Sequence, residues 1–327
     1  MTALDGSVGI GVESVYGTAV VPTRWYPVQS SDIQPEFINT EDTAIMGGGF
    51  GRRASARNRV GYGGTGSVEM EVLNKKMALL LQHITGTTVA GSATGSGYTY
   101  TMPFTRNTGK FLTVQEALPD DTDTGQPYTL VGGKIVTAEF SCEKDGNLNL
   151  SLDLDGREVI DTASLTAPSY TAALQPFNWA QCAVKIGAFG GEAAVDGVEG
   201  LSVSFERPVK TDTRYANGAG RKSEPRMNGR PTVTGTISTD FLDKADFLDR
   251  FMDGTNFSLV WEFVGAAGTG YSETFRITLP WVELDGGLPA LEGEDYVSGD
   301  LPFTALRDDE NGRAIATVTY ICADATA

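Results

Sequence analysis

The sequence contains little that would support catalysis or metal binding. It has one histidine, His83, and three widely spaced cysteines, Cys142, Cys182 and Cys322. With a single histidine, a Ser–His–Asp triad would depend on a residue at the margin of an apolar helical stripe. Three cysteines are an odd number and match no zinc or disulfide framework. We therefore expect buried thiols, folding in a reducing cytoplasm, no cofactor, no metal site and no enzymatic activity.

Long apolar runs and an excess of positive charge are also absent. No segment approaches the roughly 18–20 apolar residues of a membrane span, and no Lys or Arg precedes Arg24, so we expect no secretory signal and no membrane partner. The 327 residues include 25 Lys and Arg against 42 Asp and Glu, a formal net charge of −17. Because binding phosphates requires clustered cations, this balance argues against specific nucleic-acid binding.

What the sequence does contain is a duplicated helical pattern. Apolar residues at i, i+4, i+7 and i+11 predict a helix at two places. Each pattern stops at a Gly-Thr pair, Gly86-Thr87 and Gly254-Thr255, where glycine can adopt the positive φ of a helix C-cap. The two stripes consist of Leu73, Met77, Leu80 and Ile84, and of Phe241, Ala245, Leu248 and Met252. The chain therefore presents the same building block twice, which favours assembly rather than chemistry.

Alternating apolar and polar residues predict strands around both helices. These strands are expected over 68–72, 98–104, 110–116, 134–140 and 147–154, and then over 233–241, 257–264, 273–279, 300–306 and 314–321. The last two strands of each series are separated by a hairpin signal, Asp145-Gly146-Asn147 in one and Asn311-Gly312 in the other. The sequence therefore predicts a mainly β fold with two tandem β-sandwich or barrel modules, each flanked by one α-helix.

The same pattern predicts the domain boundaries. We expect an N-terminal arm over 1–23, a first module over 24–160, a connector over 161–182 and a second module over 183–327. Modules of this size fit the common domain length of roughly 100–150 residues.

The basic residues are concentrated in two glycine-rich segments, 39–65 and 211–231, which we expect to be loops. Together they hold 9 of the 25 basic residues and 4 of the 42 acidic ones, so the remainder has 16 basic against 38 acidic residues, a balance of −22. Long loops within compact domains are usually functional or disordered. We predict that they dock on acidic residues of a neighbouring copy through Arg52, Arg53, Arg57, Arg59, Arg214, Arg221, Lys222, Arg226 and Arg230.

The opening of the chain resembles a known family. The phrase G-x-E-x-x-Y-G-T, present here as Gly11 to Thr18 and followed by Pro22, is similar to the start of major tail tube proteins of long-tailed, non-contractile bacteriophages. The Arg-Gly segment, the stretch 66–71 with its helix, and the stretch 233–236 are similar too. The family's tube fold, shared with type VI secretion tubes, is a β-sandwich or barrel flanked by a helix.

This resemblance implies a virion structural protein whose stacked rings form the conduit for genome ejection. If six modules close a ring and each chain supplies two, three chains give a homo-trimer with pseudo-sixfold symmetry; a ring of six chains is the alternative. We expect an acidic lumen through which DNA passes without specific binding. The other expected partners are the tape measure, tail terminator and tail tip proteins. The expected location is the virion tail, after assembly in the host cytoplasm.

Two other classes of protein remain open at this point. A β-rich tail-tip or cell-surface adhesin would share the glycine-rich, acidic composition, although no aromatic binding platform is visible in the sequence. An acidic β-sandwich hydrolase is disfavoured because of the single histidine and the absence of a nucleophile motif.

Overall fold

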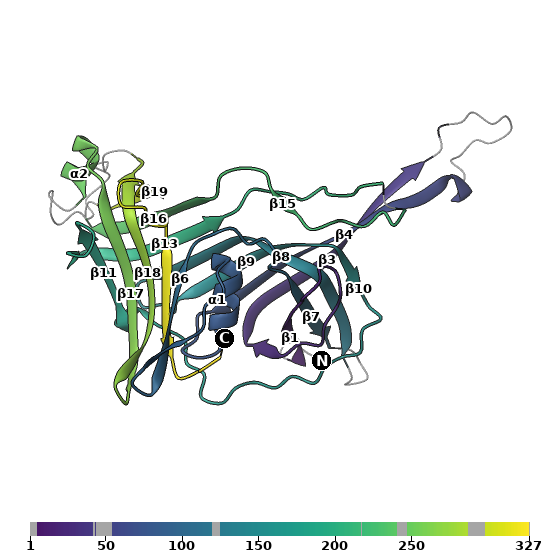
Figure 1. Ribbon diagram of the computed structural model, residues 1–327, viewed down its shortest axis with the longest axis horizontal. Coiled ribbons are helices and arrows are strands. Elements are labelled where there is room, and N and C mark those ends of the chain that lie inside the picture. Colours follow the sequence, from purple (N-terminus) through teal and green to yellow (C-terminus); the bar gives the residue numbers. More distant parts are fainter. Residues whose placement is uncertain are drawn as a thin grey trace.

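The computed structural model describes residues 5–41, 43, 54–119, 125–216, 218–240, 247–286 and 298–326. The expected mainly β fold is confirmed, and neighbouring strands of these residues are antiparallel (Figure 1). The first ten strands are β1 (Ser7–Val12), β2 (Arg24–Tyr26), β3 (Val28–Glu41), β4 (Arg57–Glu71), β5 (Ser92–Thr94), β6 (Gly97–Pro103), β7 (Leu112–Leu118), β8 (Gln126–Glu143), β9 (Asn149–Gly156) and β10 (Glu158–Ile160). The later strands are β11 (Cys182–Gly187), β12 (Ala193–Ala194), β13 (Val198–Glu206), β14 (Val209–Lys210), β15 (Arg226–Met227), β16 (Thr232–Asp240), β17 (Phe257–Gly268), β18 (Tyr271–Leu284), β19 (Ser298–Ala305) and β20 (Thr317–Cys322).

One group of strands closes on itself, and we call it the closed sheet. Strand β1 pairs with β7, β7 with β8, β8 with β9, β9 with β4, and β4 with β3. Strand β2, which precedes β3 across Pro27, pairs with β1 and so completes the group. The short strand β10 extends β9 along β8. This group forms the rolled part of the molecule on the right of Figure 1.

A second group, which we call the open sheet, continues from the other end of β8. There β8 pairs with β13, and the order continues through β16 and β19 to β18. Strand β18 also pairs with β17 and with β20, and β20 pairs with β6. Strands from both sides of the predicted connector, residues 161–182, therefore belong to one sheet. The division into tandem domains stays a prediction.

Aromatic side chains fill the centre of the open sheet. Phe140 on β8 contacts Phe205 and Phe275, with ring centroids 5.8 and 5.2 Å apart, and all three rings are buried. Phe177, from the predicted connector, packs on Phe263 and Phe275. The hydrophobic core is continuous with that of the closed sheet, and a buried aromatic cluster of this kind contributes roughly 0.5–1.5 kcal/mol per pair beyond simple burial.

Both predicted helices are present, and the first is shorter than its apolar stripe suggests. Helix α1 (Ala78–Thr85) packs against β6, β20 and β8, and it ends at Gly86 with φ 80°, as predicted. Helix α2 (Leu248–Asp253) contacts β18 and ends at Gly254 with φ 61°. Met252, predicted on the apolar face, is 63% exposed, and the stripe residues Phe241 and Ala245 lie outside the described residues.

One predicted hairpin is confirmed and the other is wrong. Strands β8 and β9 pair across the turn that contains Asp145, whose φ is 63°. Strands β19 and β20 do not pair with each other, because β19 pairs with β16 and β18 while β20 lies between β18 and β6. The turn itself is present: Asp308 accepts hydrogen bonds from Asn311 and Arg313.

The prediction of a loop over 39–65 is also wrong for residues 39–41 and 57–65. Residues 39–41 continue β3, and residues 57–65 belong to β4. The glycines of this stretch serve close packing in the ladder. At Gly63, a Cβ would lie 2.5 Å from a Glu36 carboxylate oxygen and 2.7 Å from Lys222 Cε. Glycine at position 63 therefore leaves room for the Glu36 and Lys222 side chains to pass over β4, and it does not mark a loop here.

Candidate assembly surfaces

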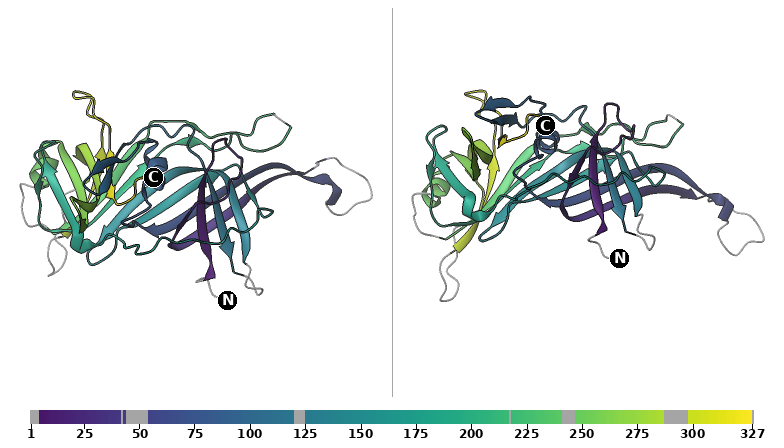
Figure 2. Two further views of the ribbon diagram at one scale, coloured as in Figure 1. Left: turned by 60° about the horizontal axis from the view of Figure 1, so that its bottom comes forward. Right: turned by 90° about the horizontal axis from the view of Figure 1, so that it is seen from below.

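The outer halves of β3 and β4 project from the closed sheet as a two-stranded hairpin, visible in all three ribbon views (Figures 1 and 2). Strand β4 pairs with β9 only from Gly64 onward. Residues 34–41 and 57–63, which we call the arm, lie along the β3–β4 ladder, and among the described residues one further bridge joins the arm to the chain, between Tyr62 and Arg221. An isolated two-stranded hairpin is marginally stable in water, and its outer edges present unpaired backbone groups. A projection of this kind is well suited to contact another molecule.

The arm combines exposed apolar and cationic side chains. Phe37, Ile38 and Val60 are 41%, 38% and 49% exposed. The Arg59 guanidinium lies over the Phe37 ring at 3.7 Å, and Tyr62 meets the same ring edge-on at 6.1 Å. Apolar surface that stays exposed on a projecting element indicates an interaction site. Sequence reasoning missed Phe37, Ile38 and Val60, because alternation predicts two faces without showing that both lie outside the core.

The second predicted basic loop lies along the root of the arm (Figure 1). We call residues 207–216 and 218–231 the strap. The Tyr62 amide donates to the Gly220 carbonyl at 2.9 Å, and Arg214 Nε donates to the Tyr62 carbonyl at 3.1 Å. The two segments predicted as equivalent, separate loops are therefore in direct contact.

Four ion pairs, one of them buried, fasten the strap to the closed sheet and to the arm. Lys222 Nζ lies 2.7 Å from Asp155 Oδ1 and 2.9 Å from Glu36 Oε2, and the Lys222 and Asp155 side chains are 3% and 6% exposed. Arg214 reaches the same Glu36 oxygen at 2.9 Å, and Arg221 Nε lies 2.7 Å from Glu158 Oε2. Removing one partner of a buried pair leaves an uncompensated charge, so this network fixes the strap at one place.

The pKa values of the two shared carboxyls reflect their positions. Burial alone would raise the pKa of Glu36, but hydrogen bonds from Lys222 and Arg214 lower it below its ordinary value. Burial raises the pKa of Asp155, and the hydrogen bond from Lys222 offsets only part of that rise. The charged form of Asp155, the more deeply buried of the two carboxyls, therefore depends more strongly on Lys222 than does that of Glu36, which also has Arg214 as a hydrogen-bond donor.

A second buried lysine holds the next turn of the strap. Lys134 on β8 is 3% exposed, and its Nζ lies 2.7 Å from Glu224 Oε1 and 3.2 Å from the Pro225 carbonyl. Glu224 also accepts a hydrogen bond from the Gly109 amide at 3.0 Å. The strap is consequently an ordered part of the structure between these contacts.

The nine cationic residues predicted for assembly are thus placed differently from one another. Three have carboxylate partners within their own chain: Arg214, Arg221 and Lys222. Four have exposed side chains, two on the arm and two on the strap: Arg57, Arg59, Arg226 and Arg230. The remaining two, Arg52 and Arg53, lie outside the described residues.

The N-terminal motif is explained by a buried carboxylate. Glu13 is 2% exposed and accepts hydrogen bonds from the Gly17 amide, the Thr113 hydroxyl and the Gly132 amide, each at 2.8 Å. Gly17 has φ 75°, and a Cβ there would lie 2.3 Å from the Arg157 side chain. These residues therefore fix the loop after β1 onto β7 and β8.

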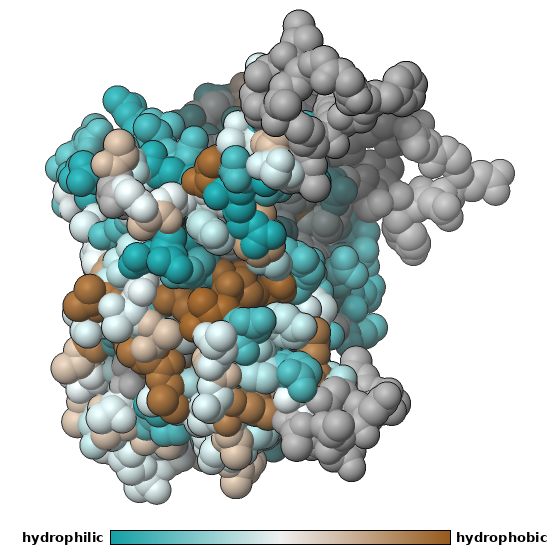
Figure 3. Space-filling view, turned by 90° about the vertical axis from the view of Figure 1, so that its right-hand side faces the viewer, coloured by the Kyte–Doolittle hydropathy of each residue, from teal (hydrophilic) through white to brown (hydrophobic). Residues whose placement is uncertain are grey.

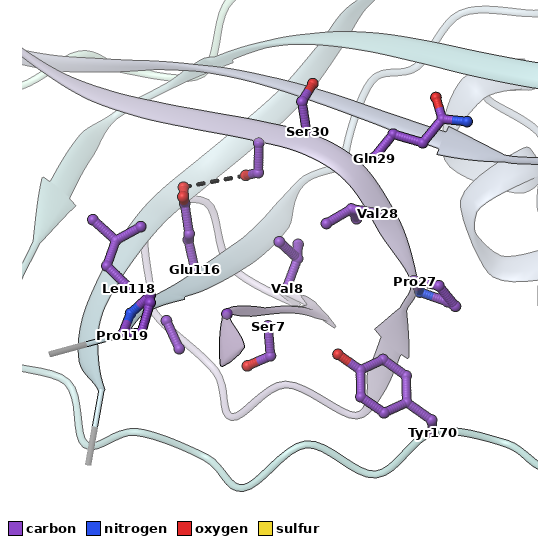
Figure 4. Close-up of a pocket in the computed structure, with 13 residues that line it drawn as sticks. Ser7, Val8, Pro27, Val28, Gln29, Ser30, Glu116, Leu118, Pro119 and Tyr170 are labelled. Atoms are coloured by element: carbon purple, nitrogen blue, oxygen red, sulfur yellow. Dashed lines mark hydrogen bonds between the residues drawn. The ribbon is translucent and has the colours of Figure 1, made fainter. Parts of the chain in front are cut away.

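A groove of about 760 Å³ opens at the end of the closed sheet where β1, β3 and β7 meet (Figure 4). Leu118 and Tyr170 lie on opposite sides of its opening, and they are 44% and 46% exposed. The carboxyl of Glu116 lies inside the groove and accepts a hydrogen bond from the Ser31 hydroxyl at 3.1 Å. Burial raises the pKa of Glu116 above its ordinary value, and the hydrogen bond with Ser31 acts against that rise.

The side of the molecule from which the arm projects also carries an apolar band across its surface (Figure 3). Polar surface borders this band on both sides. Contiguous exposed apolar surface is typical of protein–protein contacts.

His83 and the three cysteines, the residue types most often used for catalysis or metal binding, are buried or half-buried among structural residues. His83 is 6% exposed, its Nδ1 lies 2.9 Å from the Leu79 carbonyl oxygen, and burial lowers its pKa to about 4. Cys142 and Cys322 are buried thiols, and Cys182 is half-buried. Among the described residues there is no cluster of His, Cys, Asp and Glu that could hold a metal ion. Within the same ranges no helix has the length and apolar character to cross a membrane.

Comparison with known proteins assigns the chain to a family. No curated protein matches the chain. The family model described as phage tail tube protein matches residues 3–305, which include the closed sheet, the arm, the strap and the open sheet except β20. The chain belongs to the phage tail tube protein family and is a structural protein of the virion tail.

Proposed function

We propose that this chain assembles into rings that stack to form the tube of a long, non-contractile phage tail, the conduit for genome ejection. The observation that carries this proposal is the arm, a two-stranded projection with exposed Phe37, Ile38 and Val60 beside Arg59. Complete burial of a Val, Ile or Phe side chain contributes roughly 1.5–3 kcal/mol. Because these three side chains are only partly buried in the single chain, part of that free energy can still be gained when the arm meets another chain. Every chain of a ring would contribute the same amount.

In this proposal the arm extends from one ring to the next. Arg57 and Arg59 on the arm, and Arg226 and Arg230 on the strap, meet acidic surface of the adjacent ring, and Arg52 and Arg53 act with them. Each exposed pair contributes at most about 1 kcal/mol. Arg214, Arg221 and Lys222 act indirectly, because their ion pairs within the chain hold the root of the arm.

Ring composition follows from the number of β units in each chain. Three chains with two units each would close a ring with pseudo-sixfold symmetry, and six chains are the alternative. Cyclic closure is the usual outcome of a repeated heterologous contact. The mass of a single ring distinguishes the two, since three chains of 34.7 kDa weigh half as much as six.

The lumen is proposed to be acidic. Outside segments 39–65 and 211–231 the chain has 16 basic against 38 acidic residues, a balance of −22. Such walls repel DNA rather than bind it. The tube would contact the tape measure, terminator and tip proteins, and assembly would take place in the host cytoplasm.

Electron microscopy of negatively stained protein tests this function. Wild-type protein should form tubes, whereas Arg57→Ser with Arg59→Ser should give folded subunits or rings that do not stack, and high salt should reduce stacking similarly. The matched control is Lys144→Ser with Arg307→Ser, which removes the same charge from exposed positions on other elements. Full-length tubes from the arm variant would show that its arginines are not needed for stacking.

A further inference from the structure

The groove at the end of the closed sheet is a candidate binding surface. Its lining is mainly apolar and includes Pro27, Val28, Leu118, Pro119 and Tyr170. Its volume of about 760 Å³ lies within the range of roughly 300–1,000 Å³ that is typical of binding pockets. A groove of this size with a mainly apolar lining is a candidate binding site for another molecule.

Glu116 is the acidic side chain among the described residues that line the groove. Glu116 is 9% exposed, and its partners are the Ser31 hydroxyl and the Ile33 amide. Among the described residues, no Lys or Arg forms an ion pair with this carboxyl. A buried carboxyl is costly unless it is paired, so a cation supplied from outside would complete the site.

The arm carries the complementary groups. Phe37 and Ile38 offer exposed apolar surface, and Arg59 lies against Phe37 with its guanidinium 3.7 Å from the ring centroid. A guanidinium is suited to a carboxylate because its planar fork can donate two hydrogen bonds. Apolar surface flanked by a cation on the arm therefore matches apolar surface around a carboxyl in the groove.

The arm cannot reach the groove of its own chain. Strand β3 begins at Val28, which lines the groove, and Phe37 lies nine residues further along the same extended strand. At about 3.3 Å per residue the two are roughly 30 Å apart. The ladder with β4 continues over this whole span and keeps the strand extended. Groove and arm thus lie at opposite ends of the extended strand β3.

We propose that the groove receives the arm of a second copy of this chain, with Phe37 and Ile38 as apolar anchors and Arg59 as the partner of Glu116. A contact between two different surfaces of identical chains is heterologous, and without a closing rotation it produces an open stack. This inference rests on the proposed function and adds to it the surface on which the arm docks.

A complementation experiment tests the pairing of arm and groove. The groove variant is Leu118→Asp with Tyr170→Ser, and the arm variant is Phe37→Ser with Ile38→Ser and Arg59→Ser; all five side chains are exposed, so folding should be preserved. Each variant alone should form single rings. Mixed together they should form stacks of two rings, because an intact arm on one ring meets an intact groove on the other.

The matched control and the outcomes separate this inference from the proposed function. Met252→Ser with Val264→Asp changes two exposed apolar residues on α2 and β17, which are 63% and 45% exposed, and should leave stacking unchanged. If wild-type protein forms no tubes, the proposed function fails. If wild-type tubes form and the groove variant also stacks normally, or loses its rings, the groove does not receive the arm. Mixed variants that remain single rings would likewise overturn the pairing.

Discussion

Replacing Lys222 by methionine should destabilise the folded subunit and loosen the strap at the root of the arm. The change keeps the length of the side chain but removes the charge that lies 2.7 Å from Asp155 and 2.9 Å from Glu36. Glu36 retains Arg214, whereas no other ion pair of Asp155 is found among the described residues. Loss of one partner from a buried pair costs about 3–5 kcal/mol. We expect a loss in this range.

The free energy of unfolding can be measured by urea denaturation of unassembled subunits. Lys144→Met is the matched control, because Lys144 forms an exposed ion pair with Glu199 and its loss should change stability little. Adding Asp155→Leu to Lys222→Met should restore part of the loss, since both buried charges are then gone. The Tyr62 amide, which donates to Gly220, should exchange with deuterium faster in the single variant. A loss below about 1 kcal/mol, with unchanged exchange at Tyr62, would refute the assignment of the network as the anchor of the strap.

Three further predictions concern single buried groups. In Glu13→Gln an amide NH₂ group, which cannot accept hydrogen bonds, replaces one of the carboxylate oxygens that do. The free energy of unfolding, measured by urea denaturation, should therefore fall by about 1–3 kcal/mol. An unchanged midpoint would contradict this role of Glu13. The pKa of His83 is lowered to about 4, so the unfolded chain binds more protons between pH 4 and 6.5, and stability should fall by about 3 kcal/mol as pH falls through that window. His83→Phe should abolish this part of the pH dependence, and an equal slope in both proteins would count against it. Burial raises the pKa of Cys142 to about 12 and of Cys322 to about 11, so iodoacetamide at pH 8 should alkylate these thiols only after unfolding, as mass spectrometry of the folded protein would show.

The local features of the fold could be predicted from the sequence. Glycine at positive φ ends both helices at the predicted residues, Gly86 and Gly254, and the turn at Asp145 joins two paired strands. These outcomes depend on residues a few positions apart. The confirmed mainly β class follows from the same alternation of apolar and polar residues.

Features that depend on distant residues could not be predicted. The turn at Asn311 is a genuine turn, yet β20 pairs with β18 and β6, and no local signal indicates that choice. The partners of Lys222 are 67 residues away at Asp155 and much further away at Glu36. The charge pattern revealed two cationic segments, but not that one of them packs on the other. The sequence therefore indicated where the cationic segments lie, but not what they contact within the chain.

The central claim is that the arm of one ring binds the next ring and thereby builds a tube. A reconstruction of wild-type assemblies by electron cryomicroscopy tests it most directly. The account predicts an open axial stack in which residues 34–41 and 57–63 of each chain reach the adjacent ring, with Phe37 buried there. Stacked rings in which the arm points to solvent, with Phe37 as exposed as in the single chain, would contradict it.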